Sequence, residues 1–277
     1  MNGKVVVITG GTSGIGQVAA EKLAAMGARI VLVARDQQRG QATLRRLAGP
    51  AAHSIHYADL SLLAEMKRVA AEIAAAEPRI DVLINNAGAM FNSRQLTADG
   101  LERTFAVNHM AYYVVTQGLR ERLIASAPAR IVSTSSDAHK GAKLDFNDLQ
   151  SANGYSGFSV YGRSKLCNIL FTRELARQLE GTNVTANCLH PGFVATRFGD
   201  QSGGLLAPAM GFAKLFAISP EKGADTIVYL ASSAAVDKVT GQYFYQRRPA
   251  TPTPEGQDDV AARRLWQETA KLAGQER

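Results

Sequence analysis

A tyrosine and a lysine four residues apart, Tyr161 and Lys165, are the side chains of this sequence best suited to acid–base chemistry. On a helix this spacing places the phenol and the ammonium group on one face. The positive charge would favour the phenolate form and make the tyrosine a usable proton donor and acceptor. The same spacing also occurs by chance, as a partly buried tyrosine beside a solvated lysine. The pair becomes a candidate site only through the elements that position it.

A glycine-rich segment far upstream follows an apolar run and opens a helix-like stretch, which is the context of a nucleotide-binding turn. Glycines would let the backbone approach a pyrophosphate, and the helix N-terminus would supply free N–H groups and a partial positive charge. An ordinary structural turn would not require three glycines so placed. The residues predicted to bind the cofactor here are Gly10, Thr12, Ser13, Gly14, Ile15 and Gly16.

The end of the second predicted strand carries a base where an NAD site usually carries an acid. Arg35, with help from Arg39, could pair with a 2′-phosphate and stack on adenine. This favours NADP(H) as cofactor, with NAD(H) possible, because Arg35 could equally be a surface residue.

Two further segments fit a bound dinucleotide. Asp59 and Leu60, after the third predicted strand, are placed to contact the adenine, although Asp59 could instead cap the helix that starts near Ser61. The fourth strand closes with Asn85 followed by three residues that suit a chain passing close to a ribose: Asn86, Ala87 and Gly88.

The elements around these residues alternate between strand-length apolar runs and helical stretches. Strands without polar alternation, separated by helices, indicate a mostly parallel sheet covered on both faces. We therefore predict one doubly wound α/β domain over residues 1–277. Its seven predicted strands are Val5–Thr9, Arg29–Val33, Ser54–Tyr57, Val82–Asn85, Ile131–Thr134, Val184–Leu189 and Gln242–Tyr245. Its principal predicted helices are Ile15–Met26, Leu62–Ala76, Gly100–Ala125 and Tyr161–Leu179.

Two late regions break the alternation. Residues 193–219 are rich in Gly, Ala, Leu, Met and Phe, and they form either a buried helix or an apolar lid over the substrate. Residues 247–277 are predicted to be a proline-containing loop and a C-terminal amphipathic helix over Asp258–Gly274. The residues of this helix predicted to face inward are Val260, Leu265, Trp266 and Leu272.

Composition excludes several other classes of protein. The formal charge of +7 is scattered, which argues for a solvated basic surface and against a nucleic-acid partner. His53 and His56 have no carboxylate or cysteine at ligand spacing, so no metal site is expected. Cys167 and Cys188 suit buried thiols. Without a membrane-length apolar stretch or a signal-peptide pattern, we expect a cytoplasmic protein with no membrane span.

Four motifs occur in the order and approximate spacing of the classical short-chain dehydrogenases/reductases, which the sequence resembles over nearly its whole length. They are Thr9-Gly10-x-x-x-Gly14-Ile15-Gly16, Asn85-Asn86-Ala87-Gly88, Tyr161-x-x-x-Lys165 and Pro191-Gly192-x-x-x-Thr196. Within the family it is most similar to the retinol dehydrogenase group. That similarity is carried by Ser135-Ser136-x-Ala138-His139, Gly157-Phe158-x-x-Tyr161, Phe171–Arg177 and His190-Pro191-Gly192. The resemblance implies a Rossmann-type fold and a catalytic tetrad of Asn108, Ser136, Tyr161 and Lys165.

The resemblance also implies a role for each member of the tetrad. Tyr161 would exchange a proton with the carbonyl or alcohol oxygen during hydride transfer. Lys165 and an oxidised nicotinamide would stabilise the phenolate, and Lys165 would also hold the nicotinamide ribose. Ser136 would hydrogen-bond the substrate oxygen, and Asn108 would position a water that links Lys165 to solvent. The neighbouring Ser135 is the alternative to Ser136.

In the family pattern the loop after the sixth strand passes the nicotinamide. The residues expected to contact the cofactor there are Pro191, Gly192, Val194 and Thr196. The apolar residues that follow would line a pocket for a hydrophobic substrate; they are Leu205, Leu206, Met210, Phe212, Leu215 and Phe216.

The predicted function is NADPH-dependent, reversible reduction of a lipophilic aldehyde or ketone. The alternatives are an NAD-dependent dehydrogenase of a hydrophobic alcohol, a catalytically silent NADP(H)-sensing regulatory protein, and an epimerase or dehydratase of the extended branch. Helices 100–125 and 161–179 are apolar on more than one face, which favours a homodimer or homotetramer over a monomer.

Overall fold

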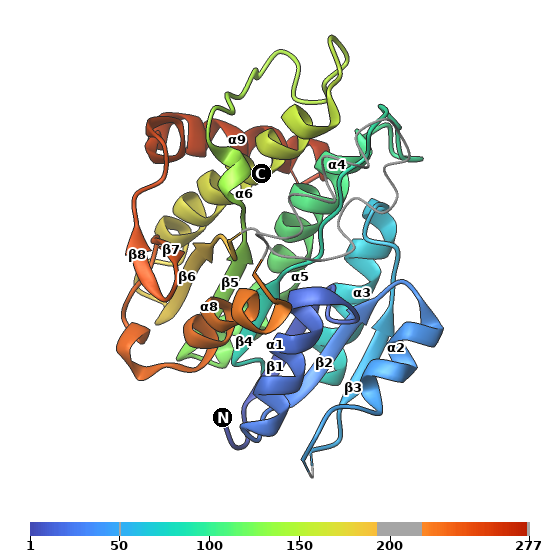
Figure 1. Ribbon diagram of the computed structural model, residues 1–277, viewed down its shortest axis with the longest axis vertical. Coiled ribbons are helices and arrows are strands. Elements are labelled where there is room, and N and C mark those ends of the chain that lie inside the picture. Colours follow the sequence, from blue (N-terminus) through green and yellow to red (C-terminus); the bar gives the residue numbers. More distant parts are fainter. Residues whose placement is uncertain (50, 193–217, 276–277) are drawn as a thin grey trace.

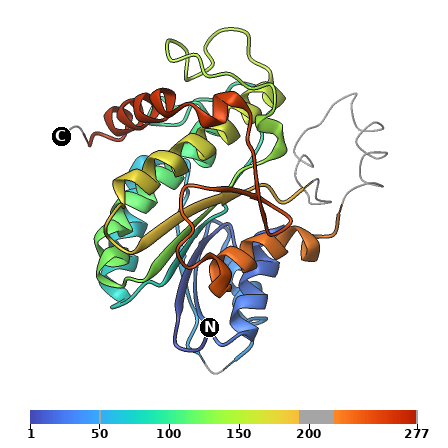
Figure 2. The ribbon, with the colours of Figure 1, turned by 90° about the vertical axis from the view of Figure 1, so that its left-hand side faces the viewer.

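The computed structural model describes residues 1–49, 51–192 and 218–275. Its strands form one sheet in the order β3-β2-β1-β4-β5-β6-β7-β8. Every neighbouring pair from β3 to β7 is parallel, and β7 pairs with β8 in antiparallel fashion. Figure 2 shows this sheet between two layers of helices. The prediction of a doubly wound, mostly parallel α/β fold is confirmed, and the described residues form eight strands in place of seven.

The elements keep the order expected from the sequence (Figure 1). The strands are β1 Val5–Thr9, β2 Arg29–Ala34, β3 Ser54–Tyr57, β4 Val82–Asn85, β5 Ala129–Thr134, β6 Val184–Leu189, β7 Tyr243–Tyr245 and β8 Arg248–Ala250. The α-helices are α1 Gly14–Ala25, α2 Gln37–Leu44, α3 Leu63–Ala76, α4 Arg103–Phe105, α5 Ala111–Ala125, α6 Gly157–Gln178, α8 Pro220–Ser232 and α9 Asp259–Leu272. The shorter turns are the π-helix η1 Ala106–Met110 and the 3-10 helices η2 Asp137–His139, η3 Ala234–Val236 and η4 Pro254–Gln257.

The additional strand, β8, lies where the sequence predicted only a loop. Gln246 and Arg247 adopt φ values of 48° and 63°, and they turn the chain back so that Phe244 pairs with Pro249. A proline has no N–H to donate, so it is tolerated in a strand at the edge of a sheet. The proline that argued for a loop therefore occupies an edge strand.

Alternate side chains of each central strand enter different cores. In β1, Val5 and Val7 belong to the core formed with α3, α5 and α6, whereas Val6 and Ile8 belong to the core formed with α1 and α8. This alternation is the geometry of a strand with both faces covered. The polar residues at the carboxyl ends of β1, β4, β5 and β6 consequently lie together on the carboxyl-terminal side of the sheet.

The long helix predicted over residues 100–125 is interrupted. Glu102, which is fully buried, caps α4 by accepting hydrogen bonds from the backbone N–H groups of Thr104 (2.9 Å) and Phe105 (2.8 Å). The π-helix η1 then separates α4 from α5 and carries Asn108. Hydrophobic periodicity cannot reveal a single wider turn, because the apolar face continues through it.

The C-terminal helix α9 packs on α6 and contacts α5 through Trp266 (Figures 1 and 2). Trp266 stacks on Phe171 of α6 with ring centroids 5.8 Å apart, and it meets Tyr113 of α5 edge-on at 4.9 Å. Leu265 faces inward as predicted, but Val260 is 68% exposed because it lies in the first turn of α9, beyond this contact. Part of the apolar surface of α6 is therefore covered by α9, and the homodimer or homotetramer stays a prediction.

Within the described ranges, every helix is too short or too polar to span a bilayer. The same residues contain no cluster of three or more His, Cys, Asp or Glu side chains that could hold a metal ion.

Candidate active site

The glycine-rich turn joins the carboxyl end of β1 to α1. Gly10 has a φ of +67°, and a Cβ at this position would lie 2.7 Å from the Cα of Ala87. Gly14, with a φ of +54°, begins α1 after Ser13, whose side chain makes no capping hydrogen bond. The start of α1 can therefore offer backbone N–H groups to an anion, as a pyrophosphate would require. The predicted residues Thr12 and Ile15 lie in the same turn and are half-buried.

Asn86 ties the end of β4 to this turn. Its Nδ2 donates hydrogen bonds to the carbonyl oxygens of Thr9 (3.2 Å) and Gly10 (3.1 Å). In return, Thr9 Oγ1 accepts from the backbone N–H groups of Asn86 (3.0 Å) and Ala87 (3.1 Å). A Cβ at Gly16 would lie 2.3 Å from Asn86 Nδ2, so only glycine fits there. The structure thus brings together the two glycine-containing motifs that the sequence assigned to one cofactor.

The two arginines predicted to select the cofactor lie beyond the end of β2. Arg35 directly follows the strand and Arg39 lies on α2, and both side chains are exposed. The nearest acid, Asp36, caps α2 by accepting the backbone N–H of Arg39 at 2.9 Å. The other carboxylate oxygen of Asp36 lies 4.0 Å from Arg39 Nε, and the choice between NADP(H) and NAD(H) stays a prediction.

Asp59 follows β3, the neighbour of β2 at the edge of the sheet. Its Oδ1 accepts the backbone N–H of Ser61 at 3.0 Å, and α3 begins only at Leu63. The carboxylate therefore stabilises the turn before the helix, which resembles the capping alternative, while Leu60 is buried. The proposed contact of these two residues with adenine stays a prediction.

Ser136 and Tyr161 are brought together by the packing of α6 against η2. A Cβ at Gly162, the residue after Tyr161, would lie 2.5 Å from the carbonyl oxygen of Ala138. Because glycine leaves this space free, the helix can approach the turn closely enough for Ser136 to hydrogen-bond the phenol of Tyr161.

Replacing Gly162 by alanine is expected to push α6 away from η2 and to lower kcat/KM by roughly 100-fold, since a displacement of about 1 Å can have that effect. A Ser159→Ala change at an exposed position of α6 is the matched control. Steady-state kinetics of both variants would check this result. Full activity of Gly162→Ala would show that the close approach of the two elements is not needed.

Lys165 lies one turn further along α6 and is only 3% exposed. Its Nζ lies 5.5 Å from the centroid of the Tyr161 ring and donates a hydrogen bond to the carbonyl oxygen of Thr134 at 3.1 Å. The same oxygen accepts from the Tyr112 hydroxyl (3.3 Å) and from Asn168 Nδ2 (3.2 Å). The last carbonyl of β5 thus fixes the lysine beside the tyrosine.

Burial shifts both ionisable groups toward their neutral forms. It lowers the pKa of Lys165 to about 7. It also raises the pKa of Tyr161 to about 12, although the hydrogen bond from Ser136 acts in the opposite direction. The sequence suggested that the lysine charge would favour the phenolate, but in the protein alone burial outweighs that effect. At neutral pH Tyr161 therefore holds its proton.

Asn108 is held in the π-helix by groups of the protein. Its Oδ1 accepts the backbone N–H of Ala89 (2.8 Å), and its Nδ2 donates to the Ala89 carbonyl (2.9 Å) and to Ser164 Oγ (2.9 Å). A Cβ at Gly88 would lie 3.3 Å from both Asn108 Oδ1 and Lys165 Nζ. Asn108 is thus placed beside Lys165, and its role in ordering a water stays a prediction.

The structure separates the three neighbouring serines. Ser135 is buried, and its hydroxyl donates to the backbone carbonyl of Lys165 at 2.8 Å, which fastens β5 to α6. Ser133 is likewise buried within β5. Ser136 is the partly exposed one that reaches Tyr161. This arrangement favours Ser136 over Ser135 as the residue that contacts substrate.

The loop after β6 is described only as far as Gly192. Gly192 has a φ of +89°, and its N–H donates to His190 Nδ1 at 3.3 Å. Val194 and Thr196 lie outside the described residues, as does the predicted lid except for Ile218 and Ser219. Ser219 caps α8 by accepting the backbone N–H of Lys222.

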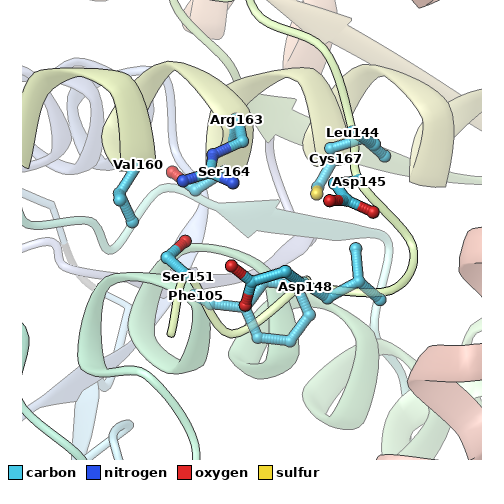
Figure 3. A pocket seen from close by; sticks show the side chains of 10 residues that line it. Phe105, Leu144, Asp145, Asp148, Ser151, Val160, Arg163, Ser164 and Cys167 are labelled. Carbon is cyan, nitrogen blue, oxygen red and sulfur yellow. The ribbon is translucent and has the colours of Figure 1, made fainter. Parts of the chain in front are cut away.

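A small pocket lies behind the catalytic face of α6 (Figure 3). Arg163, Ser164 and Cys167 of α6 line one side, and Asp145 and Asp148 of the preceding loop are also at its wall. Asp148 accepts the backbone N–H groups at the end of its own loop, which lowers its pKa. The residues that line this pocket join α6 to the preceding loop, and we do not assign the pocket to the substrate.

Sequence reasoning missed two contributors to this geometry. Gly162 carried no signal beyond its position after Tyr161, and its importance depends on an approach that only the folded chain shows. Thr134 contributes its backbone carbonyl, which every residue type possesses.

Comparison with known proteins identifies the family. The family model described as short chain dehydrogenase matches residues 4–203. Human retinol dehydrogenase 14 is 40% identical, with 99% of this chain and 87% of the relative covered. Human retinol dehydrogenase 13 is 38% identical, with 99% and 86% covered. The chain therefore belongs to the short-chain dehydrogenase/reductase family and is similar to retinol dehydrogenases.

Solved structures agree with this assignment. An uncharacterized protein from Mycobacterium paratuberculosis is 30% identical with a TM-score of 0.80, covering 99% of this chain and 95% of that one. A short-chain dehydrogenase from Burkholderia cenocepacia, determined in complex with NADP, is 27% identical with a TM-score of 0.71, covering 88% and 96%. The protein is an oxidoreductase of alcohol and carbonyl groups, and the cofactor of its family is NAD(P)(H).

Proposed function

We propose that this protein is an NADP(H)-dependent oxidoreductase that interconverts a lipophilic aldehyde or ketone and its alcohol, with Tyr161 as the acid/base. The observation that carries the proposal is that Tyr161 lies between Ser136 and the buried Lys165. This group is at the carboxyl ends of the strands, where the glycine-rich turn also lies. The turn fits a dinucleotide because its glycines and the start of α1 leave room and N–H groups for a pyrophosphate. Gly88, beside Lys165, would let the ribose approach the lysine.

In the direction of reduction, a bound nicotinamide would supply the hydride. The residues of the chain bind the substrate oxygen and transfer its proton. Ser136 donates a hydrogen bond to the carbonyl oxygen, and Tyr161 transfers its phenolic proton to that oxygen. Lys165, held on Thr134, stabilises the negative charge that develops on the phenol. The reverse reaction uses the same groups, with the phenolate accepting the alcohol proton. At neutral pH Tyr161 carries its phenolic proton, which is the form that reduction requires.

Two observations support a lipophilic aldehyde, ketone or alcohol as the substrate. The relatives are named retinol dehydrogenases, so their named substrate is a lipophilic alcohol. In addition, the sequence that follows Gly192 is largely apolar. A panel of aliphatic, aromatic, steroid and retinoid aldehydes and ketones, assayed by oxidation of NADPH, tests the proposal. Failure to turn over any member in either direction would refute it.

The preference for NADP(H) depends on Arg35. Replacing Arg35 by alanine is expected to raise the KM for NADPH about tenfold or more while leaving that for NADH nearly unchanged, because only the former carries the 2′-phosphate. Arg46→Ala, an exposed arginine after α2, is the control for a general loss of positive charge. An equal change for both cofactors, or a wild-type preference for NADH, would contradict the assignment.

A further inference from the structure

His139 lies three residues after Ser136 and is completely buried, although its side chain takes no part in the chemistry described above. We propose that His139 is a positioning residue, which fixes Ser136 in η2 and connects this turn to the loop after β8. The inference rests on the proposed function of Ser136, and it concerns the bond from His139 to Ser136 rather than the bond to the loop after β8.

The hydrogen bonds of His139 determine which ring nitrogen carries the proton. The backbone N–H of Thr253 points to Nε2 at 3.4 Å, and because a backbone N–H can only donate, Nε2 must be the acceptor. Nδ1 therefore carries the proton and donates it to the carbonyl oxygen of Ser136 at 2.7 Å. One neutral ring thus bridges the two segments, and burial lowers the pKa of His139, which maintains this form.

The bond from Nδ1 acts on the residue that contacts substrate. The Ser136 carbonyl accepts both Nδ1–H and the backbone N–H of His139 (3.2 Å), while Ser136 Oγ accepts the backbone N–H of Ala138 (3.2 Å). A 3-10 turn of three residues has few hydrogen bonds of its own, so the additional bond supports it substantially. Tyr243 also packs edge-on against the ring, with centroids 5.3 Å apart.

Two substitutions separate the two ends of the bridge. His139→Asn retains an N–H donor near the position of Nδ1 and loses the acceptor for Thr253. His139→Gln is one methylene longer, so it can reach Thr253 with its carbonyl oxygen but removes the donor to Ser136. Both replacements are polar and smaller than or similar to histidine, so they serve as matched controls for each other.

We expect His139→Gln to lower kcat about tenfold or more, because this variant loses the hydrogen bond to the Ser136 carbonyl. His139→Asn keeps that bond, so its kcat should stay within about threefold of wild type. The dissociation constant for NADPH, followed by its fluorescence, should be unchanged in both. If His139 acts through Ser136, adding His139→Gln to Ser136→Ala should cause no further loss. Equal losses in the two single variants, or losses that multiply in the double variant, would overturn the proposal.

Hydrogen–deuterium exchange provides a readout that does not require turnover. The peptide that contains residues 136–140 should exchange faster in His139→Gln than in His139→Asn, and the peptide that contains Thr253 should show the opposite order. Unchanged exchange at residues 136–140 in His139→Gln would overturn the proposal whatever the activity. A wild-type protein without turnover would instead refute the proposed function, while the exchange pattern would still decide whether His139 holds the turn.

Discussion

Replacing Tyr161 by phenylalanine is expected to lower kcat/KM for carbonyl reduction by about 1,000-fold or more, because the phenol is the proton donor and general acid–base catalysis typically contributes 10²–10⁴-fold. The ring remains, so its packing beside Ser136 and Lys165 is preserved. Binding of NADPH should be nearly unaffected. Steady-state kinetics with NADPH and a cofactor titration would measure the two effects separately.

Tyr229→Phe is the matched control for this change. Tyr229 lies on α8, where its ring packs near Phe244 with centroids 6.5 Å apart, away from the candidate site. Its variant should keep the wild-type rate. If Tyr161→Phe retained wild-type kcat/KM, the proton would have another source and the proposed mechanism would be wrong.

Replacing Lys165 by methionine is expected to abolish measurable turnover and, at the same time, to stabilise the protein in the absence of cofactor. Burial disfavours the ammonium form of Lys165, so the folded state is penalised at neutral and lower pH. Methionine fills a similar volume, and the Thr134 carbonyl keeps its bonds from Tyr112 and Asn168. Removing the buried amine should raise the free energy of unfolding by about 2 kcal/mol, equivalent to roughly 5 °C in Tm.

The pH dependence of stability gives a second measure of the same group. The pKa of Lys165 is about 7 in the folded protein and 10.5 as its ordinary value, so between these values the unfolded chain binds more protons. Stability of the wild type should therefore rise with pH from about 7 upward relative to Lys165→Met. Thermal denaturation of both proteins between about pH 7 and 8.5 avoids the ordinary range of tyrosine ionisation.

Lys238→Met, at an exposed position, controls for the loss of one positive charge and should change neither activity nor Tm appreciably. A Lys165→Met protein that is less stable than wild type at pH 7 would show that the lysine stabilises the fold. In that case the lysine would be better described as a structural group than as a strained catalytic one.

The sequence was most informative where chemistry requires a particular residue type. Gly10 and Gly16 were predicted to form a tight turn, and in the structure a Cβ at either position would lie too close to Ala87 or Asn86. The parallel character of the sheet also followed from apolar runs separated by helices, since strands covered on both faces show little polar alternation.

What could not be predicted depends on backbone atoms and on distant contacts. The pairing of Pro249 with Phe244 required a tight turn that the proline-rich sequence did not indicate. The pKa shifts of Tyr161 and Lys165 depend on how deeply the two side chains are buried, and the four-residue spacing does not reveal this depth. The choice between Ser135 and Ser136 likewise required the direction of each hydroxyl.

The cover that α9 provides has a consequence for the synthesis of the chain. Phe171 of α6 and Tyr113 of α5 are translated well before Trp266, so their apolar surfaces remain open while the intervening residues are made. During that interval the helix that carries Tyr161 lacks part of its packing, and such surface favours association with other chains. The apolar surface around Tyr113 and Phe171 can be covered by Trp266 only after α9 has been synthesised.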